Sequence, residues 1–236
     1  MMRFREQQQR RRKLAELSKK GAAAGAAASP DSLHIQLIEL ENDVAKLNAL
    51  QRRIDRTAMK RDVLLPKWMP VTQRYLDSGK VFKNLVFACC IVWLFDVDEL
   101  GQALQWADIA IEQGQDTPEN IKRDFAHFTA DAVLEWAQTI APQGQSVEPY
   151  FSDTFERVKS AWCINEELTA KYYKFAGLQL LRAKDGKPLV KAVVDAGVLQ
   201  EADSLLEQAE TFYTNIGVGT MRKNIAARLR KLEQDA

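Results

Sequence analysis

DVLLPKWMP, residues 62–70, lies between a charged run with helical spacing and the most apolar segment of the chain, LVFACCIVWLF at residues 85–95. Proline has no backbone N–H and clashes with the preceding turn, so Pro66 and Pro70 should end or bend any helix that enters this stretch. The large apolar side chains around them would pack inside the bend. The stretch therefore predicts an elbow between two helical parts, made of Leu64, Leu65, Pro66, Trp68 and Pro70.

The charged run before the elbow carries a heptad pattern. From Leu33 to Ala58 the apolar spacing alternates between four and three residues, which is typical of a helix that packs against another helix. Ser29 and Pro30 favour a helix start just before it. Such an apolar stripe needs a partner, either a second copy or the following domain, and the spacing leaves both open. The candidate oligomerisation residues are Leu33, Leu37, Leu40, Val44, Leu47 and Ile54.

Every segment after Pro70 has helical spacing, and none shows sustained polar–apolar alternation between hairpin turns. We expect an all-α fold, with a long N-terminal assembly helix joined by the proline elbow to a multi-helix C-terminal domain. A helix is expected to open at Asp96, with Glu99 completing a capping box. The expected parts are a basic, flexible arm with an Ala/Gly tether at 1–28, the heptad helix at 29–65, a helical body at 66–142 and a C-terminal helical region at 143–236.

Composition places limits on the class of protein. The chain has 236 residues, of which 46% are hydrophobic, enough to bury a core. The eleven apolar residues at 85–95 are too few for a membrane span, which needs about 20. The N-terminus is rich in Arg and Gln, so no signal peptide is expected. Cys89, Cys90 and Cys163 lack metal-ligand spacing and fit reduced thiols in a cytoplasm.

The net charge of +1 is unevenly distributed, because the N-terminal tip is strongly basic. Residues 1–20 hold eight basic and two acidic side chains, a net charge of +6, which leaves −5 for the remainder. Such a tip can neutralise DNA phosphates, and the alternative is a solubilising tail. A second basic cluster ends the heptad helix, where a solvated face is the simpler interpretation unless several copies form a ring. The candidate DNA-binding residues are Arg3, Arg5, Arg10, Arg11, Arg12, Lys13, Lys19 and Lys20 in the tip, and Arg52, Arg53, Arg56, Lys60 and Arg61 in the second cluster.

A third basic cluster lies on the expected final helix. It reads as a charged outer face, with docking of a partner as the second interpretation. The candidate partner-docking residues are Arg222, Lys223, Arg228 and Arg230.

The sequence offers little for catalysis. It has two histidines, His34 and His127, neither beside a plausible nucleophile, and it has no phosphate-binding loop of the G-x-x-x-x-G-K-[ST] kind. Asp96, Asp98 and Glu99 could hold Mg²⁺ for phosphodiester cleavage, but their position at a helix start favours capping. We therefore expect no catalytic residue, no metal site and no cofactor.

Two stretches resemble a known family. KRDVLLPKWMP at 60–70, followed by VWLFDVDELGQALQWADIAIEQG at 92–114, is similar to the small terminase subunit of temperate tailed phages of the Peduovirus kind. In that family a helix runs into a Leu-Leu-Pro-x-Trp-x-Pro element, and a Trp-x-x-Asp-x-Gly-Asp-like turn precedes an Ala-rich helix. The similarity is best over residues 33–140. The turn here reads Asp96-Val97-Asp98-Glu99 and lacks the family's glycine.

The resemblance implies a role in viral genome packaging. Small terminase subunits recognise the packaging site on double-stranded viral DNA, assemble as ring-like homo-oligomers and deliver the DNA to a large subunit with the ATPase and nuclease. That places the protein in the host cytoplasm during phage assembly. The family is also labelled an endonuclease subunit, which we assign to the holoenzyme. Two alternatives remain: an endonuclease subunit with its own metal-dependent cleavage, and a helical protein–protein adaptor without a DNA role.

Overall fold

The computed structural model describes residues 33–183 and 186–234. Within these ranges the chain is all-α, as the sequence predicts, and strand-like pairing is limited to one isolated bridge between Arg182 and Pro188. None of the helices described there is long and apolar enough to cross a membrane. Of the described residues, those up to Lys46 form one compact unit and those from Leu47 onward form a second. The predicted basic arm at 1–28 lies outside the described residues.

The heptad pattern does not form one helix. α2 (Leu33–Ala49) ends first, residues 50–52 are not helical, and α3 (Arg53–Met59) starts a new helix. The prediction of one continuous assembly helix is therefore wrong, and Ile54 lies on a different helix from the other heptad residues. No glycine or proline occurs between these two helices. Local helix propensity therefore does not account for the break.

The stretch DVLLPKWMP is helical throughout. α3 continues into a π-helical turn, Lys60–Leu64, and then into α4 (Leu65–Asp77), with right-handed helical backbone angles at both junctions. The prediction that a helix ends within this stretch is therefore wrong, because the chain stays helical through Pro66 and Pro70. The π turn gives a physical reason: its wider hydrogen bonding, with Leu65 N–H donating to the carbonyl of Lys60, repositions the carbonyls that the ring of Pro66 would meet in an α-helix.

The expected burial of the apolar residues in this stretch is confirmed. Leu64, Leu65 and Trp68 are 0%, 4% and 1% exposed. Pro66 is the second residue of α4, directly after the π turn, and Pro70 lies inside the helix. The stretch thus anchors α4 in the core.

α5 (Leu85–Asp96) and α6 (Leu100–Glu112) form the centre of the helical body. α5 is buried along most of its length, as expected for its uninterrupted apolar sequence, and Asn84 caps it by accepting from Phe87 N–H. α6 buries Ala103, Ala107 and Ala110 completely, and α5 packs against it. Small side chains at this spacing let the two helices approach closely.

The turn between α5 and α6 differs from the expected capping box. α5 runs through Asp96, and α6 is preceded by Glu99, whose side chain caps no N–H. Asp98 instead closes α5 in a left-handed conformation, with φ of 63°. Its N–H bonds the carbonyl of Phe95, and the N–H of Glu99 bonds that of Leu94, which is the Schellman pattern. Helix C-terminal geometry therefore outweighs the N-capping potential of these acids.

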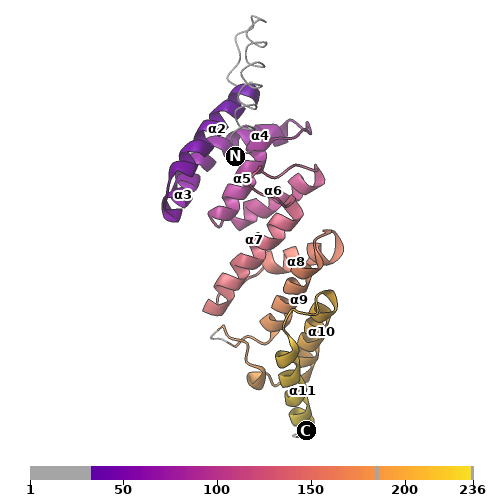
Figure 1. Ribbon diagram of the computed structural model, residues 1–236. Coiled ribbons are helices and arrows are strands. Elements are labelled where there is room, and N and C mark those ends of the chain that lie inside the picture. The colour runs from indigo at the N-terminus through magenta and orange to yellow at the C-terminus, as the bar shows by residue number, and fades with distance from the viewer. Residues whose placement is uncertain (1–32, 184–185, 235–236) are drawn as a thin grey trace, which may run out of the picture. The chain divides into compact units, whose positions relative to one another are not determined.

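The rest of the second unit consists of α7 (Phe125–Ile140), α8 (Tyr150–Ser160), α9 (Glu166–Leu180), α10 (Ala196–Phe212) and α11 (Gly219–Gln234). From α4 onward, each helix packs against the next one in sequence (Figure 1). One core cluster joins α7, α8 and α9, and a second joins α9, α10 and α11, so α9 belongs to both. Phe151 and Tyr172 stack in the first cluster, with ring centroids 5.5 Å apart.

Candidate nucleic-acid interface

The described part of the predicted DNA-binding surface lies on α3 and the π turn. α3 has no buried residue. Arg52, Arg53 and Arg61 are exposed, and Arg56 and Lys60 are half-buried. The predicted DNA-binding residues of the tip, Arg3 to Lys20, lie outside the described residues.

Three of these five cations are paired with carboxylates. Arg52 lies 4.0 Å from Asp55, and Arg61 Nε donates to its neighbour Asp62 at 3.0 Å, a hydrogen bond that raises the pKa of Arg61. Lys60 Nζ lies 2.5 Å from an Asp96 carboxylate oxygen, and only 15% of the lysine side chain is exposed. Lys60 therefore has a structural role, because it links the π turn to the end of α5.

Arg53 and Arg56 differ from the other three. Neither forms an ion pair with any residue in the described ranges. They are three residues apart on one short helix, so their side chains project from neighbouring positions on one face. Arg53 and Arg56 are thus the two guanidinium groups of this cluster that have no carboxylate partner within the described ranges.

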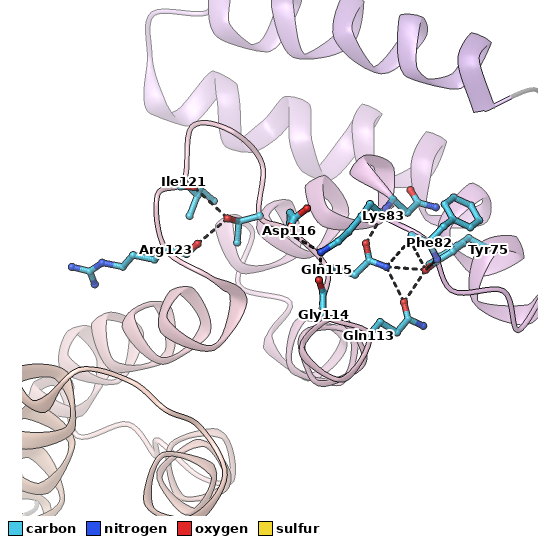
Figure 2. A network of polar contacts seen from close by, with 11 residues as sticks. Tyr75, Phe82, Lys83, Gln113, Gly114, Gln115, Asp116, Ile121 and Arg123 are labelled. Atoms are coloured by element: carbon cyan, nitrogen blue, oxygen red, sulfur yellow. Dashed lines mark hydrogen bonds and ion pairs between the residues drawn. The ribbon is translucent and has the colours of Figure 1, made fainter.

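A polar network joins the loop after α4 to the loop after α6 (Figure 2). Gln115 is at its centre: Nε2 donates to the Tyr75 hydroxyl at 2.9 Å and to the carbonyl of Phe82 at 2.8 Å, and Oε1 accepts from Asn84 N–H at 2.8 Å. Tyr75 also donates to Gln113 Oε1 at 2.8 Å. The network is buried and mutually satisfied, so it rigidifies both loops. Sequence reasoning missed it, because long-range amide pairing leaves no periodic signal.

The acidic residues considered for Mg²⁺ do not form a site together. Asp96 is engaged by Lys60, Asp98 adopts the left-handed turn position, and Glu99 precedes α6. Within the described ranges, no group of three His, Cys, Asp or Glu side chains is placed to hold a metal ion.

The predicted partner-docking residues on α11 divide into two kinds. Arg222 pairs with three carboxylates of α10, those of Asp203, Glu207 and Glu210, at distances of 2.9–3.0 Å. Arg228 donates to the carbonyl of Val193 at 3.0 Å. Arg222 and Arg228 therefore link α11 to α10 and to the segment at Val193. Lys223 and Arg230 are exposed.

The family assignment rests on comparison with known proteins. The family model described as phage small terminase subunit matches residues 37–167, from α2 to the first turn of α9. The chain belongs to this small terminase subunit family. The matched range contains α3, the π turn and the turn at Asp98, whereas α10 and α11 lie beyond it.

Two curated relatives are similar to this small terminase subunit. The "Probable terminase, endonuclease subunit" of Haemophilus phage HP1 (strain HP1c1) is 39% identical over 195 residues, which cover 83% of this chain and 69% of the relative. The "Terminase, endonuclease subunit" of Escherichia phage P2 is 28% identical over 174 residues, covering 73% and 67%. No solved structure matches the chain. The resemblance drawn from the sequence is thereby confirmed.

Proposed function

We propose that this small terminase subunit binds viral DNA at the packaging site, assembles into a homo-oligomer and delivers the DNA to the large subunit for genome packaging in the host cytoplasm. The observation that carries the proposal is the family match over residues 37–167, which includes the basic helix α3. The chain would act by recognition, without chemistry of its own.

Electrostatics supports the DNA-binding step. Arg53 and Arg56 present two cations without acidic partners in the described part of the chain, and the tip adds a net charge of +6. Each phosphate neutralised contributes a slope of about −0.9 to the log–log dependence of affinity on salt. One α3 helix makes few such contacts, so several copies on one duplex would raise the effective affinity by avidity.

The heptad residues support the assembly step to different degrees. Leu33 and Ile54 are 41% and 65% exposed, whereas Leu40 and Leu47 are buried at 1% and 6%. Leu37 and Val44 are half-buried. We therefore assign inter-subunit contact first to Leu33 and Ile54, which can meet a second copy with little rearrangement.

A second candidate function comes from the names of the two relatives, which call them endonuclease subunits. If this chain cleaves DNA itself, supercoiled plasmid incubated with the purified full chain and Mg²⁺ should be nicked, and Asp96→Asn together with Asp98→Asn should abolish the nicking. Under our proposal the plasmid stays supercoiled. An intrinsic, mutation-sensitive nicking activity would replace it.

Light scattering with and without phage-end DNA tests binding and assembly together. We expect a mass above that of one 26.7 kDa chain without DNA, and a larger complex with it. Removal of residues 1–28 should weaken DNA binding and flatten its salt dependence. A protein that stays monomeric at high concentration and ignores DNA at low salt would fit the adaptor alternative instead.

A further inference from the structure

A groove of about 810 Å³ lies in the second unit, between α7, α9 and the turn that joins α10 to α11. Its apolar lining comes from three places: Leu134 on α7, Phe175 and Leu178 on α9, and Ile216 in the turn. The three elements lie in the lower half of Figure 1. None of the residues predicted from the sequence to bind DNA or a partner lines it.

The charges that line the groove are not balanced. Arg123 pairs with Asp131, and Lys171 pairs with Glu167 at 2.6 Å. Lys174 and Arg182 remain on the α9 side, and Glu135 remains on the α7 side. None of these three side chains forms an ion pair within the described ranges.

Lys174 and Arg182 are nevertheless held in place. Lys174 Nζ donates to the carbonyl of Ile216 at 2.7 Å, and Arg182 Nε donates to Gln179 Oε1 at 2.6 Å. The Arg182 guanidinium also lies 5.4 Å from the ring centroid of Phe175 and donates to the carbonyl of Gly186. All these acceptors are neutral, so both cations are positioned with their charge intact. A positioned cation binds an anion with less loss of side-chain freedom.

Partial burial strengthens the preference of Arg182 for an anionic ligand. Both side chains are half-buried. Burial lowers the pKa of Arg182, because its charge is partly desolvated and no carboxylate compensates it. A bound anion would supply that compensation.

The positions of the two cations limit the kind of ligand. Lys174 lies on α9, and Arg182 lies just beyond the end of this helix, with its guanidinium over the ring of Phe175. Phe175 and Leu178 lie between them and line the same groove. A fitting ligand therefore carries at least two negative groups, one for each cation, as an acidic peptide segment does.

The position of Glu135 favours a peptide over a nucleic acid as the ligand. A phosphate backbone carries negative charge all along its length, and it would meet the unpaired carboxylate of Glu135 on the opposite wall. A peptide can instead place a lysine or arginine there.

We propose that this groove docks an acidic segment of the large terminase subunit, with its carboxylates on Lys174 and Arg182 and a basic residue on Glu135. The partner rests on the proposed function, in which the two subunits form a complex. The docking surface is then built by α7 and α9, and α11 is not its main element.

The test measures complex formation between the full chain and the purified large subunit of the same phage by isothermal titration calorimetry. Lys174→Glu with Arg182→Glu should weaken the complex about 100-fold, because each reversal turns an attraction into a repulsion. Lys80→Glu with Lys191→Glu changes the net charge equally at exposed positions outside the groove, and it should leave the affinity within about twofold. Lys174→Arg with Arg182→Lys keeps both charges and should retain most of the affinity.

Glu135→Lys distinguishes the two classes of ligand. It should weaken the complex with the large subunit and leave DNA affinity unchanged. If Glu135→Lys strengthens DNA binding while the Lys174/Arg182 reversal abolishes it, the groove takes nucleic acid and the proposal is overturned. Circular dichroism checks that each variant is folded, and Lys174→Gln with Arg182→Gln replaces the reversal if that pair does not fold.

Two negative results have different meanings. A wild-type complex that the groove reversal leaves intact overturns the groove and spares the proposed function. No complex between the wild-type chain and the large subunit overturns the delivery step of the proposed function, and the docking proposal with it.

Discussion

Lys60 and Asp96 form an ion pair, with Nζ 2.5 Å from Oδ2, that joins the π-helical turn to the end of α5. The sequence makes Lys60 a candidate DNA-binding residue and Asp96 a candidate helix cap, with Mg²⁺ binding as the less favoured alternative. Their pairing gives each a structural task. It also separates Lys60 from Arg53 and Arg56, which have no such partner in the described ranges.

This separation predicts unequal effects on DNA binding. Arg53→Ala and Arg56→Ala should each reduce the slope of log affinity against log salt by about 0.9, the value for one lost phosphate contact. Lys60→Met should change the slope less, because its ammonium group is held by Asp96. Fluorescence anisotropy over a salt series measures the slopes, and Lys80→Ala is the control at an exposed lysine outside α3. Equal slopes for all four variants and the wild type would remove α3 from the interface.

Trp68 should contribute strongly to stability. It is 1% exposed, so Trp68→Ala leaves a large cavity and should lower the free energy of unfolding by about 3–5 kcal/mol. Val63, in the same stretch, is 54% exposed, and Val63→Ala should cost less than about 0.5 kcal/mol. Urea unfolding followed by tryptophan fluorescence and circular dichroism compares the two. Similar midpoints for both variants would contradict the burial of Trp68.

The left-handed conformation at Asp98 predicts which substitutions the turn accepts. Asp98→Gly should keep or raise the stability, because glycine adopts a φ of 63° without a steric penalty. Asp98→Val should lower it by about 1–2 kcal/mol, since a β-branched side chain is strongly disfavoured there. Thermal unfolding of the two variants measures the difference. A valine variant as stable as the glycine variant would mean that the turn is not left-handed.

Asp124 predicts a loss of stability in acid. Partial burial acts to raise its pKa, but hydrogen bonds from the backbone and ring of His127 and from Ala126 N–H outweigh this, so the pKa lies below the usual 3.8. The carboxylate therefore stabilises the fold above pH 3.8, and that contribution disappears as the pH falls through the lowered folded-state value. Its size is modest, because 64% of the side chain is exposed.

The matched variant for this effect is Asp124→Asn, which retains an oxygen to accept the α7 cap bond from His127 N–H but does not titrate. At pH 7 the wild type should be the more stable of the two. The difference should shrink below pH 3.8 and vanish near the lower limit of the titration. Chemical unfolding at a series of pH values measures it, and a difference independent of pH would show that the charge of Asp124 plays no part.

Several elements could be read from the sequence because their signals are local. The apolar run that forms α5, the small residues of α6 and the burial of Trp68 all follow from side-chain type and helical spacing. The family could likewise be named from the residues around Pro66 and Pro70. Local signals gave a wrong prediction where two of them competed. At Asp98 the chain adopts the geometry that ends α5, and the predicted capping box for α6 does not form.

What the sequence alone determined is the class of the fold, the apolar core residues and the terminase family, since these depend on composition, periodicity and motif. Only the tertiary structure decided where the N-terminal helix breaks, that the two prolines remain within a helix, which cations are already paired, and that α7 and α9 form a groove. The ion pairs and the groove depend on contacts between residues far apart in the chain, such as Lys60 with Asp96. Spacing along one helix carries no information about a partner on another, so packing has to settle it.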